Sequence, residues 1–355
     1  MFGPLKLRPV FKDYLWGGRN LERLGKNLPE GIVAESWEVS CHEAGPSVVS
    51  EGALAGVTLQ DLVARHPVEM LGTSLAPRFG KIFPLLVKLI DANDRLSVQV
   101  HPDDRYAALR EGGQLGKNEM WYILQAKPGA RLVYDVKPGL DRERFRRALE
   151  EDRIEDCLGS LDVVAGDFVN IPAGMLHAIG SGILLLEVQQ SSNLTYRVYD
   201  YDRMDPHGQR RELHTQKALE VIDFSSSLRS GKLPGLTLPL AHGGARRILV
   251  INPYFQVEEW TTPGSLAQDT RAERFVLYTV IEGRGQLEHQ GQALPLSPGQ
   301  TVFVPAQAGA HVLAGRLKLV RATIPDSVPA ALVELSASGL SPAELAQHIA
   351  GLEQP

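Results

Sequence analysis

Residues 95–124, RLSVQVHPDDRYAALREGGQLGKNEMWYIL, carry the most informative pattern in this sequence. Gln99 and His101 lie two positions apart in an alternating run, and residues at that spacing in a strand point to the same face. The branched residues around them favour a strand, and Pro102 ends it. A second apolar run opens with Glu119. We therefore expect two strands, each with polar groups on one face.

A third segment, Gly166–His177 (GDFVNIPAGMLH), delivers His177 just after a Pro-x-Gly turn. If this segment meets the other two, one amide oxygen, two imidazoles and one carboxylate share a pocket. Those donors suit a first-row divalent metal, with zinc as the leading candidate. Two alternatives stay open: a lone histidine after a turn is often only hydrogen-bonded, and water could replace Gln99 as a ligand.

Composition narrows the class of protein. The 355 residues leave room for two or three lobes, and 43% hydrophobic with 22% charged residues is ordinary for a soluble globular protein. A net charge of -5 and scattered basic residues argue against nucleic acid as a partner. No apolar stretch approaches the roughly 20 residues that span a bilayer, and the first residues lack a signal-peptide pattern. Cys41 and Cys157 form no CxxC pair. We expect a cytoplasmic protein with no membrane partner.

Secondary structure is predicted to be mainly β. Apolar runs indicate strands at 83–92, 130–134, 163–171 and 183–189. From residue 241 onward, short strands alternate with Gly-rich turns, as in a sandwich or small barrel. Helices are predicted near 58–75, with Thr58 as N-cap, at 141–158, with Asp141 as N-cap, at 215–222 and after Ser341. The stretch 225–239, rich in Ser, Gly and Pro, is predicted to be a linker.

Two motifs together resemble a known family. Gly166-x5-Pro172-x-Gly174-x2-His177 matches the opening of the second cupin motif. The segment Leu96–Asp103, followed by Lys117–Glu119, is similar to the signature of type I mannose-6-phosphate isomerases. Trp16-Gly17-Gly18 and Glu35-Ser36-Trp37-Glu38 look like the short bacterial branch of that family. The resemblance is dense over residues 10–205 and thin afterwards.

This resemblance implies a mainly β fold of two cupin (jelly-roll) domains with a small helical insertion. The expected division is a metal-binding catalytic cupin domain at 1–235, a second, metal-free cupin-like domain at 241–325 and a helical tail at 326–355. In the second domain His289 and His311 have no matching carboxylate, so we expect a structural role for it.

The resemblance also implies one zinc ion per chain, held by Gln99, His101, Glu119 and His177. Many cupins instead have His-x-His with the Glu a few residues on, whereas Glu119 lies 18 positions after His101. That departure separates this chain from the oxalate-oxidase type and fits the isomerase type.

Further site residues follow from the same resemblance. Glu187 lies ten residues beyond His177, and Arg197 ten beyond Glu187, which fits the active-site Glu and Arg. Lys117 corresponds to the Lys that precedes the metal-binding Glu. The residues expected to be catalytic are Arg197, Glu187 and Lys117, and those expected to bind substrate are Ser97, Lys117, Arg197 and Trp16. The alternatives are core packing for Trp16, a buried ion pair for Glu187, with Arg197 as one candidate partner, and surface positions for Lys117 and Arg197.

The implied activity is an aldose–ketose isomerisation. It would interconvert mannose 6-phosphate and fructose 6-phosphate through a cis-enediol, feeding mannose use or GDP-mannose precursor supply. The proton-transfer base stays open among Glu187, metal-bound water and His177, and the oligomeric state stays open between monomer and dimer. The rival hypotheses are a non-catalytic sugar-phosphate-binding cupin, an iron-dependent cupin oxygenase and a structural or storage bicupin.

Overall fold

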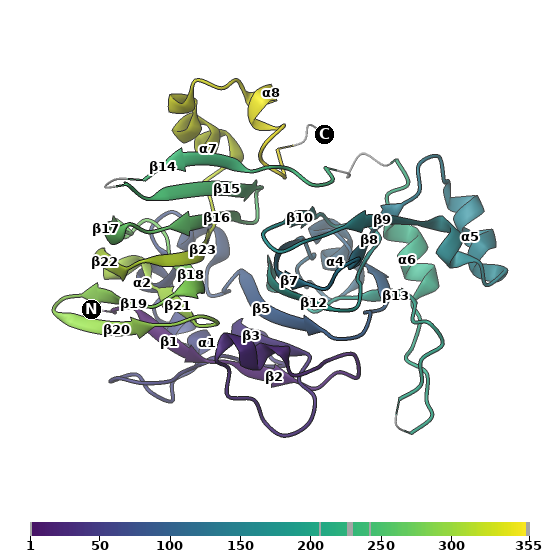
Figure 1. Ribbon diagram of the computed structural model, residues 1–355, viewed down its shortest axis with the longest axis horizontal. Coiled ribbons are helices and arrows are strands. Elements are labelled where there is room, and N and C mark those ends of the chain that lie inside the picture. The colour runs from purple at the N-terminus through teal and green to yellow at the C-terminus, as the bar shows by residue number, and fades with distance from the viewer. Residues whose placement is uncertain (1, 206, 226–229, 241–242, 353–355) are drawn as a thin grey trace.

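The computed structural model describes residues 2–205, 207–225, 230–240 and 243–352, and Figure 1 shows two β-rich lobes side by side. Within these ranges, no helix has both the length and the apolar character needed to cross a membrane. Each lobe is a sandwich of a larger and a smaller antiparallel sheet. The prediction of a mainly β, cupin-like fold is therefore confirmed.

The first lobe pairs a six-stranded sheet with a five-stranded one. Its strands are β2 (Val10–Lys12), β3 (Glu35–Val39), β5 (Leu85–Ala92), β6 (Val98–Val100), β7 (Glu119–Ala126), β8 (Arg131–Val136), β9 (Leu158–Asp162), β10 (Phe168–Ile171), β11 (His177–Ile179), β12 (Ile183–Gln190) and β13 (Tyr196–Tyr199). The two sheets have the orders β10-β7-β12-β5-β3-β2 and β13-β6-β11-β8-β9.

The second lobe pairs an eight-stranded sheet with a four-stranded one. Its strands are β1 (Leu5–Arg8), β4 (Val48–Val49), β14 (Leu236–Pro239), β15 (Ala245–Ile251), β16 (Gln256–Thr261), β17 (Gly264–Asp269), β18 (Val276–Gly283), β19 (Gly285–His289), β20 (Gln292–Leu296), β21 (Thr301–Val304), β22 (Ala310–Gly315) and β23 (Leu317–Thr323). The orders are β14-β15-β16-β23-β18-β21-β1-β4 and β17-β22-β19-β20.

Short helices lie outside the sheets. The α-helices are α1 (Leu59–Arg65), α2 (Pro67–Leu71), α3 (Ala76–Phe79), α4 (Asp104–Arg110), α5 (Arg142–Glu150), α6 (Thr215–Val221), α7 (Val328–Leu335) and α8 (Pro342–Leu345). The 3-10 turns are η1 (Asn20–Leu24), η2 (Ile154–Cys157), η4 (Ala306–Ala308) and η5 (Ser336–Ser338). Thr58, Asp141 and Ser341 accept the N-capping hydrogen bonds that the sequence predicts.

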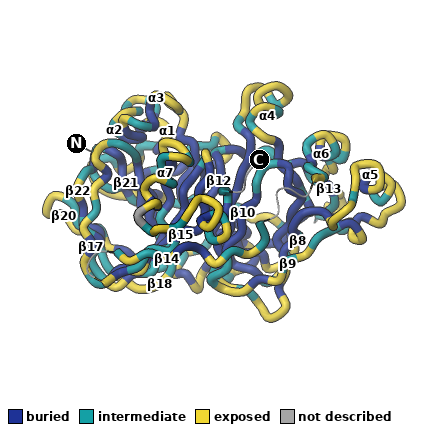
Figure 2. Tube along the Cα trace, turned by 90° about the horizontal axis from the view of Figure 1, so that it is seen from above, coloured by how far each residue is buried: buried dark blue, intermediate teal, exposed yellow. Residues whose placement is uncertain are grey.

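The two large sheets pack back to back through their apolar faces. Strand β7 shows how, because successive side chains point to opposite faces. Met120 and Tyr122 belong to the core between the lobes, together with Leu277 of β18, while Trp121 and Ile123 face the interior of the first lobe. Figure 2 shows this continuous buried centre in dark blue. The same alternation directs Glu119 and Trp121 to one interior face, where the candidate site lies.

Several predicted boundaries are wrong. The helix predicted at 141–158 ends at Glu150, and Asp152 then adopts a left-handed φ of 54° before η2 and β9 begin. Helix α4 was missed, although Asp103 caps it. Residues 236–239 of the predicted linker form β14, and residues 226–229 lie outside the described part of the chain. Strands β17 and β20 are the edge strands of the four-stranded sheet, and their sequences lack clear alternation.

The N-terminal strand crosses the predicted domain boundary. β1 hydrogen-bonds to β21 and to β4, so two strands from the first 50 residues complete the large sheet of the second lobe. Helices α7 and α8 pack on β14 and β15 through Leu335 and Leu345. The division at 235, 241 and 325 stays a prediction.

Candidate active site

Three segments distant in the sequence meet in the first lobe. Gln99 of β6 lies opposite His177, the first residue of β11. The backbone N–H of Gly174 donates to the carbonyl of His101 at 2.9 Å, and that of Lys117 donates to the carbonyl of Pro102 at 3.0 Å. Gly174 has φ of 87°, a conformation in which glycine carries no steric penalty. The Pro-x-Gly turn and the start of β7 are therefore both fixed against the end of β6.

Two imidazoles and one carboxylate converge at this junction. The Nε2 atoms of His101 and His177 lie 3.1 Å apart, and Glu119 places Oε1 3.3 Å from the first and Oε2 3.7 Å from the second. One ligand atom from each residue falls within 4.8 Å of the others, and all three residues are buried. Among the described residues, no donor hydrogen-bonds to Glu119 Oε2.

The hydrogen bonds around the rings leave lone pairs directed at one point. His177 donates from Nδ1 to the carbonyl of Met175 at 2.8 Å, so its Nε2 carries a lone pair. Lys117 Nζ lies 3.1 Å from His101 Nε2, where an ammonium donates and the ring nitrogen accepts. Two ring lone pairs and a carboxylate that face one another repel. The Lys117 ammonium offsets this repulsion at His101 Nε2 and Glu119 Oε1, and a metal ion would offset it at His177 Nε2 and Glu119 Oε2 as well. The donor set therefore fits a metal ion, and zinc is among the metals that accept it.

The electrostatic environment of this cluster favours the protonation states that a metal ion requires of its ligands. Burial, reinforced by Lys117, lowers the pKa of His101 to about 3, and burial also lowers the pKa of His177, so both rings are neutral at neutral pH. Burial alone would raise the pKa of Glu119. The adjacent Lys117 ammonium, 2.6 Å from Oε1, and the two imidazoles instead hold that pKa well below its ordinary value.

A cavity of about 280 Å³ opens beside the His101–Glu119–His177 cluster. The residues predicted from the sequence that line it are Trp16, Ser97, Gln99, Lys117, Glu187 and Arg197. Trp16 is buried in the wall of this cavity, so core packing and substrate contact are compatible for it. The next residue, Gly17, packs closely on the neighbouring backbone, since a Cβ at this position would lie 2.6 Å from the backbone of Ala34. The surface alternative for Lys117 is wrong, because Lys117 is buried.

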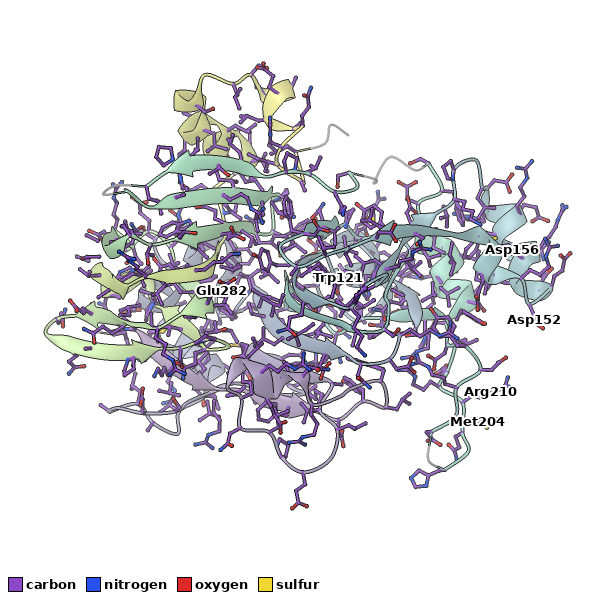
Figure 3. The ribbon with its side chains drawn as sticks, in the orientation of Figure 1. Trp121, Asp152, Asp156, Met204, Arg210 and Glu282 are labelled. Atoms are coloured by element: carbon purple, nitrogen blue, oxygen red, sulfur yellow. The ribbon has the colours of Figure 1, made fainter. Side chains whose placement is uncertain are left out.

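Glu187 lies deep in this cavity between two donors. Trp121 Nε1 donates to its Oε1 at 2.9 Å, and Lys88 Nζ lies 2.8 Å from its Oε2. Figure 3 shows Trp121 in the middle of the first lobe. Glu187 is thus ion-paired, as one alternative held, but with Lys88 on the neighbouring strand and not with Arg197. Burial, and next the Glu119 carboxylate, raise the pKa of Glu187 above its ordinary value.

Lys88 and Glu35 belong to the same cavity and were missed from the sequence. Lys88 Nζ lies 3.9 Å from Glu35 Oε2, which also accepts a hydrogen bond from Trp37 Nε1 at 2.6 Å. Burial disfavours the Lys88 ammonium, yet the surrounding carboxylates raise its pKa overall. The available signal was a lysine inside the apolar run of β5, where a charged side chain is rare.

Arg197 reaches the cavity from β13. Its Nε donates to Ser97 Oγ at 3.3 Å and its Nη1 donates to the carbonyl of Glu212 at 2.8 Å. Arg211 lines the same cavity, and its Nε donates to Asp200 Oδ2 at 2.8 Å. Arg211 was missed because it lies in a polar loop with several other charged residues. Two guanidinium groups, those of Arg197 and Arg211, therefore line the cavity that opens beside the His101–Glu119–His177 cluster.

Replacing Lys88 by methionine tests the buried ion pair. We expect Lys88→Met to lower the free energy of unfolding by about 3–5 kcal/mol, because Glu187 and Glu35 then stay buried without a cation. Lys81→Met, at an exposed lysine, is the matched control and should change stability by no more than about 0.5 kcal/mol. Urea unfolding measures both. Equal stability of the two variants would contradict the structural importance of the pair.

The sequence and the fold match one group of known proteins. Residues 4–124 match the family described as phosphomannose isomerase type I, catalytic domain, and residues 246–324 match the mannose-6-phosphate isomerase cupin domain. The chain is 40% identical to the probable mannose-6-phosphate isomerase GmuF of Bacillus subtilis, over 89% of this chain and 97% of that protein. The chain belongs to the type I phosphomannose isomerase family.

Other members of this family agree. Mannose-6-phosphate isomerase ManA of Bacillus subtilis is 37% identical over 88% of this chain and 96% of its own length. The crystal structure of the Bacillus subtilis mannose 6-phosphate isomerase superposes with a TM-score of 0.83 at 35% identity, covering 90% of this chain and 99% of that one. The family assignment from the sequence motifs is therefore confirmed for nearly the whole chain.

Proposed function

We propose that this phosphomannose isomerase family member interconverts mannose 6-phosphate and fructose 6-phosphate at the cavity beside His101, Glu119 and His177. One observation carries the proposal: a cation-binding cluster, a buried carboxylate with a raised pKa and two guanidinium groups line a single cavity. Moving a proton between C1 and C2 of a sugar phosphate requires a base, positive charge near the developing enediolate and groups that bind the phosphate.

The metal in this proposal is one zinc ion per chain. His101, Glu119 and His177 would hold it, with the amide oxygen of Gln99 as a fourth donor from the strand opposite His177. When bound, zinc supplies Lewis-acid polarisation of the sugar oxygens. The donor types support zinc, since two neutral imidazoles and a carboxylate are common in its catalytic sites.

Glu187 is proposed as the proton-transfer group. Its carboxylate is buried, so it meets the substrate with little competing water, and its raised pKa brings it closer to the working pH of a base. Lys88 and Trp121 hold the two carboxylate oxygens in place. His177 is a poorer base in this arrangement because its Nε2 lone pair is directed to the position proposed for the metal ion.

The pH dependence of catalysis should follow Glu187. The carboxylate form is the active one, so kcat/KM should fall as the pH drops through the raised pKa. Trp121→Phe removes a hydrogen bond that stabilises the carboxylate, so the acid limb should move to higher pH while Glu187→Gln abolishes turnover. Rate profiles between pH 4 and 9 measure this. An acid limb that does not move in Trp121→Phe would remove Glu187 from the role of base.

The cationic residues are proposed to bind the charged parts of the substrate. Arg197 and Arg211 present guanidinium groups that suit a phosphate, and Ser97 and Asp200 fix their orientation. Lys117 contacts the His101–Glu119–His177 cluster and also lines the cavity, where its ammonium can stabilise the enediolate. Trp16 supplies an apolar wall of the cavity.

Two rivals predict different results. A sugar-phosphate-binding cupin needs no buried carboxylate tuned towards neutral pH, so Glu187 favours the isomerase. An iron cupin oxygenase is typically built on two histidines and a carboxylate as well, but the lysine and arginine groups around this cluster favour an anionic sugar substrate. A coupled assay that converts mannose 6-phosphate to fructose 6-phosphate is decisive. Absence of turnover in the zinc-loaded protein would leave only the binding role.

The cellular setting is part of the same proposal. Cys41 and Cys157 are both free thiols, which suits a reducing compartment, so we propose a cytoplasmic enzyme. The reaction would connect mannose use or GDP-mannose precursor supply with fructose 6-phosphate. The oligomeric state stays open between monomer and dimer.

A further inference from the structure

The strand pairings of the second lobe repeat those of the first, position by position. Gly166-x5-Pro172 and Gly299-x5-Pro305 provide a common starting point in the sequence. Three residues after each glycine, a valine lies opposite an aromatic residue: Trp121 in the first lobe and Tyr278 in the second. The same register, followed across the two large sheets, gives the second-lobe equivalents of Glu187, Lys88 and Glu35. Lys117 and Arg274 each lie four residues before the aromatic residue, and Gln99 and Gln268 lie opposite His177 and His311.

The equivalent residues of the second lobe also surround a cavity, of about 330 Å³. The equivalent pairs, first lobe then second, are Glu187 and Arg321, Lys88 and Glu258, Glu35 and Arg246, Gln99 and Gln268, and Lys117 and Arg274. All five second-lobe residues in these pairs line that cavity. His311 is equivalent to His177, and each ring contacts the carbonyl two residues before it.

The charges at three of these positions are reversed in the second cavity. In the first lobe, two carboxylates flank the Lys88 ammonium next to a cation-binding cluster. In the second lobe, the guanidinium groups of Arg246 and Arg321 flank the Glu258 carboxylate at 4.0 and 3.6 Å. Val276 stands at the position of Glu119, so the second cavity has no carboxylate there. The Arg246 and Arg321 guanidinium groups therefore offer donors to an anion, while Asp269, Glu273 and Glu334 also line this cavity.

The arginines of this cavity retain hydrogen-bonding capacity. Glu258 is buried, but its two oxygens accept hydrogen bonds at 2.6 Å from Gln256 Nε2 and Trp260 Nε1, not from the guanidinium groups. Arg321 lies over the Trp260 ring, 5.4 Å from its centroid, and its buried Nε has no acceptor among the described residues. A buried donor without an acceptor costs free energy that a bound oxyanion would recover.

We propose that this second cavity is a binding site for a small oxyanion, a carboxylate or phosphate group carried by a small molecule. Arg321 and Arg246 would donate to its oxygens, and Gln268 would contribute an amide at the mouth of the cavity. The Trp260 ring holds the Arg321 guanidinium in orientation, since a flat guanidinium stacks on an indole. The volume is within the range of small-molecule sites. This site is separate from the isomerase cavity and does not depend on its chemistry.

Fluorine NMR of the full chain separates the two cavities. Of the four tryptophans, Trp16 and Trp121 line the first cavity and Trp260 lines the second. In zinc-loaded protein labelled with 5-fluorotryptophan, each resonance is assigned by a Trp→Phe variant. Inorganic phosphate and malonate are titrated in separate arms, which distinguishes phosphate from carboxylate recognition. We expect the Trp260 resonance to shift with saturation in at least one arm, whatever happens at Trp16 and Trp121.

Variants decide whether the arginines cause that shift. Arg321→Met should weaken the Trp260 response at least about tenfold, the usual effect of losing a charged hydrogen bond. Arg316→Met, at an exposed arginine in the turn before β23, is the matched control and should leave the response unchanged. If Arg321→Met loses the dispersed resonances of a folded chain, Arg246→Met replaces it. The proposal is overturned if neither phosphate nor malonate shifts the Trp260 resonance. It is also overturned if the arginine variants leave the size and midpoint of that shift unchanged.

Discussion

An Arg197→Ala variant should keep its zinc and lose about 100- to 1000-fold in kcat. The reason is geometric: Arg197 lines the cavity without touching the His101–Glu119–His177 cluster, and its guanidinium is fixed by Ser97 and by the carbonyl of Glu212. Removal of the guanidinium takes positive charge from the substrate and leaves the metal donors in place. Steady-state kinetics and metal analysis on the same sample measure the two effects.

Arg210→Ala is the matched control for that variant. Arg210 is exposed and pairs with Asp202 at 2.9 Å, and Figure 3 shows it on an extended loop well away from Trp121. Exposed ion pairs contribute little, so Arg210→Ala should have near-normal kinetics. Arg197→Lys should recover only part of the lost activity, because an ammonium cannot reproduce the fork of a guanidinium. Near-normal turnover in Arg197→Ala would remove this residue from the mechanism.

His101→Ala should remove zinc and turnover together. Its Nε2 lies 3.1 Å from that of His177 and 3.3 Å from Glu119 Oε1, so the variant loses one of the three donors that converge there. We expect dialysed His101→Ala to hold well under a tenth of an equivalent of metal and to show isomerase activity reduced in the same proportion. Inductively coupled plasma mass spectrometry gives the metal content.

His207→Ala serves as the control for the loss of a histidine, because His207 is exposed on a loop. It should retain one zinc per chain and full activity. A His101→Ala protein that still isomerises mannose 6-phosphate without metal would contradict the ligand assignment. One that keeps its metal but is inactive would show that His101 acts on the substrate and not as a ligand.

The members of the His101–Glu119–His177 cluster were predictable because local spacing and a family motif mark them in the sequence. His101 and Gln99 follow the two-residue period of a strand, and the Pro-x-Gly turn before His177 fixes where that side chain begins. The convergence of the His101, Glu119 and His177 side chains agrees with the prediction, whereas the ligand role of Gln99 stays a prediction. Glu187 was identifiable because a carboxylate is rare inside an apolar run.

Other parts of the site depend on pairings that span the fold. Lys88 and Glu187 lie 99 positions apart and meet only because β5 and β12 are neighbours in the sheet. Arg211 enters the cavity from a loop whose course follows no periodic pattern. The contribution of β1 to the second lobe is likewise a matter of long-range pairing, because a four-residue strand does not specify its partner. Topology, which local patterns do not encode, determined each of these.

Metal dependence is tested by a zinc titration of metal-stripped protein, followed by the rate at which mannose 6-phosphate becomes fructose 6-phosphate. We expect negligible turnover without metal, a linear rise with added zinc and a sharp end point at one zinc per chain. Full activity in the stripped protein, or no activity at any zinc concentration, would contradict a metal-dependent isomerase built on His101, Glu119 and His177.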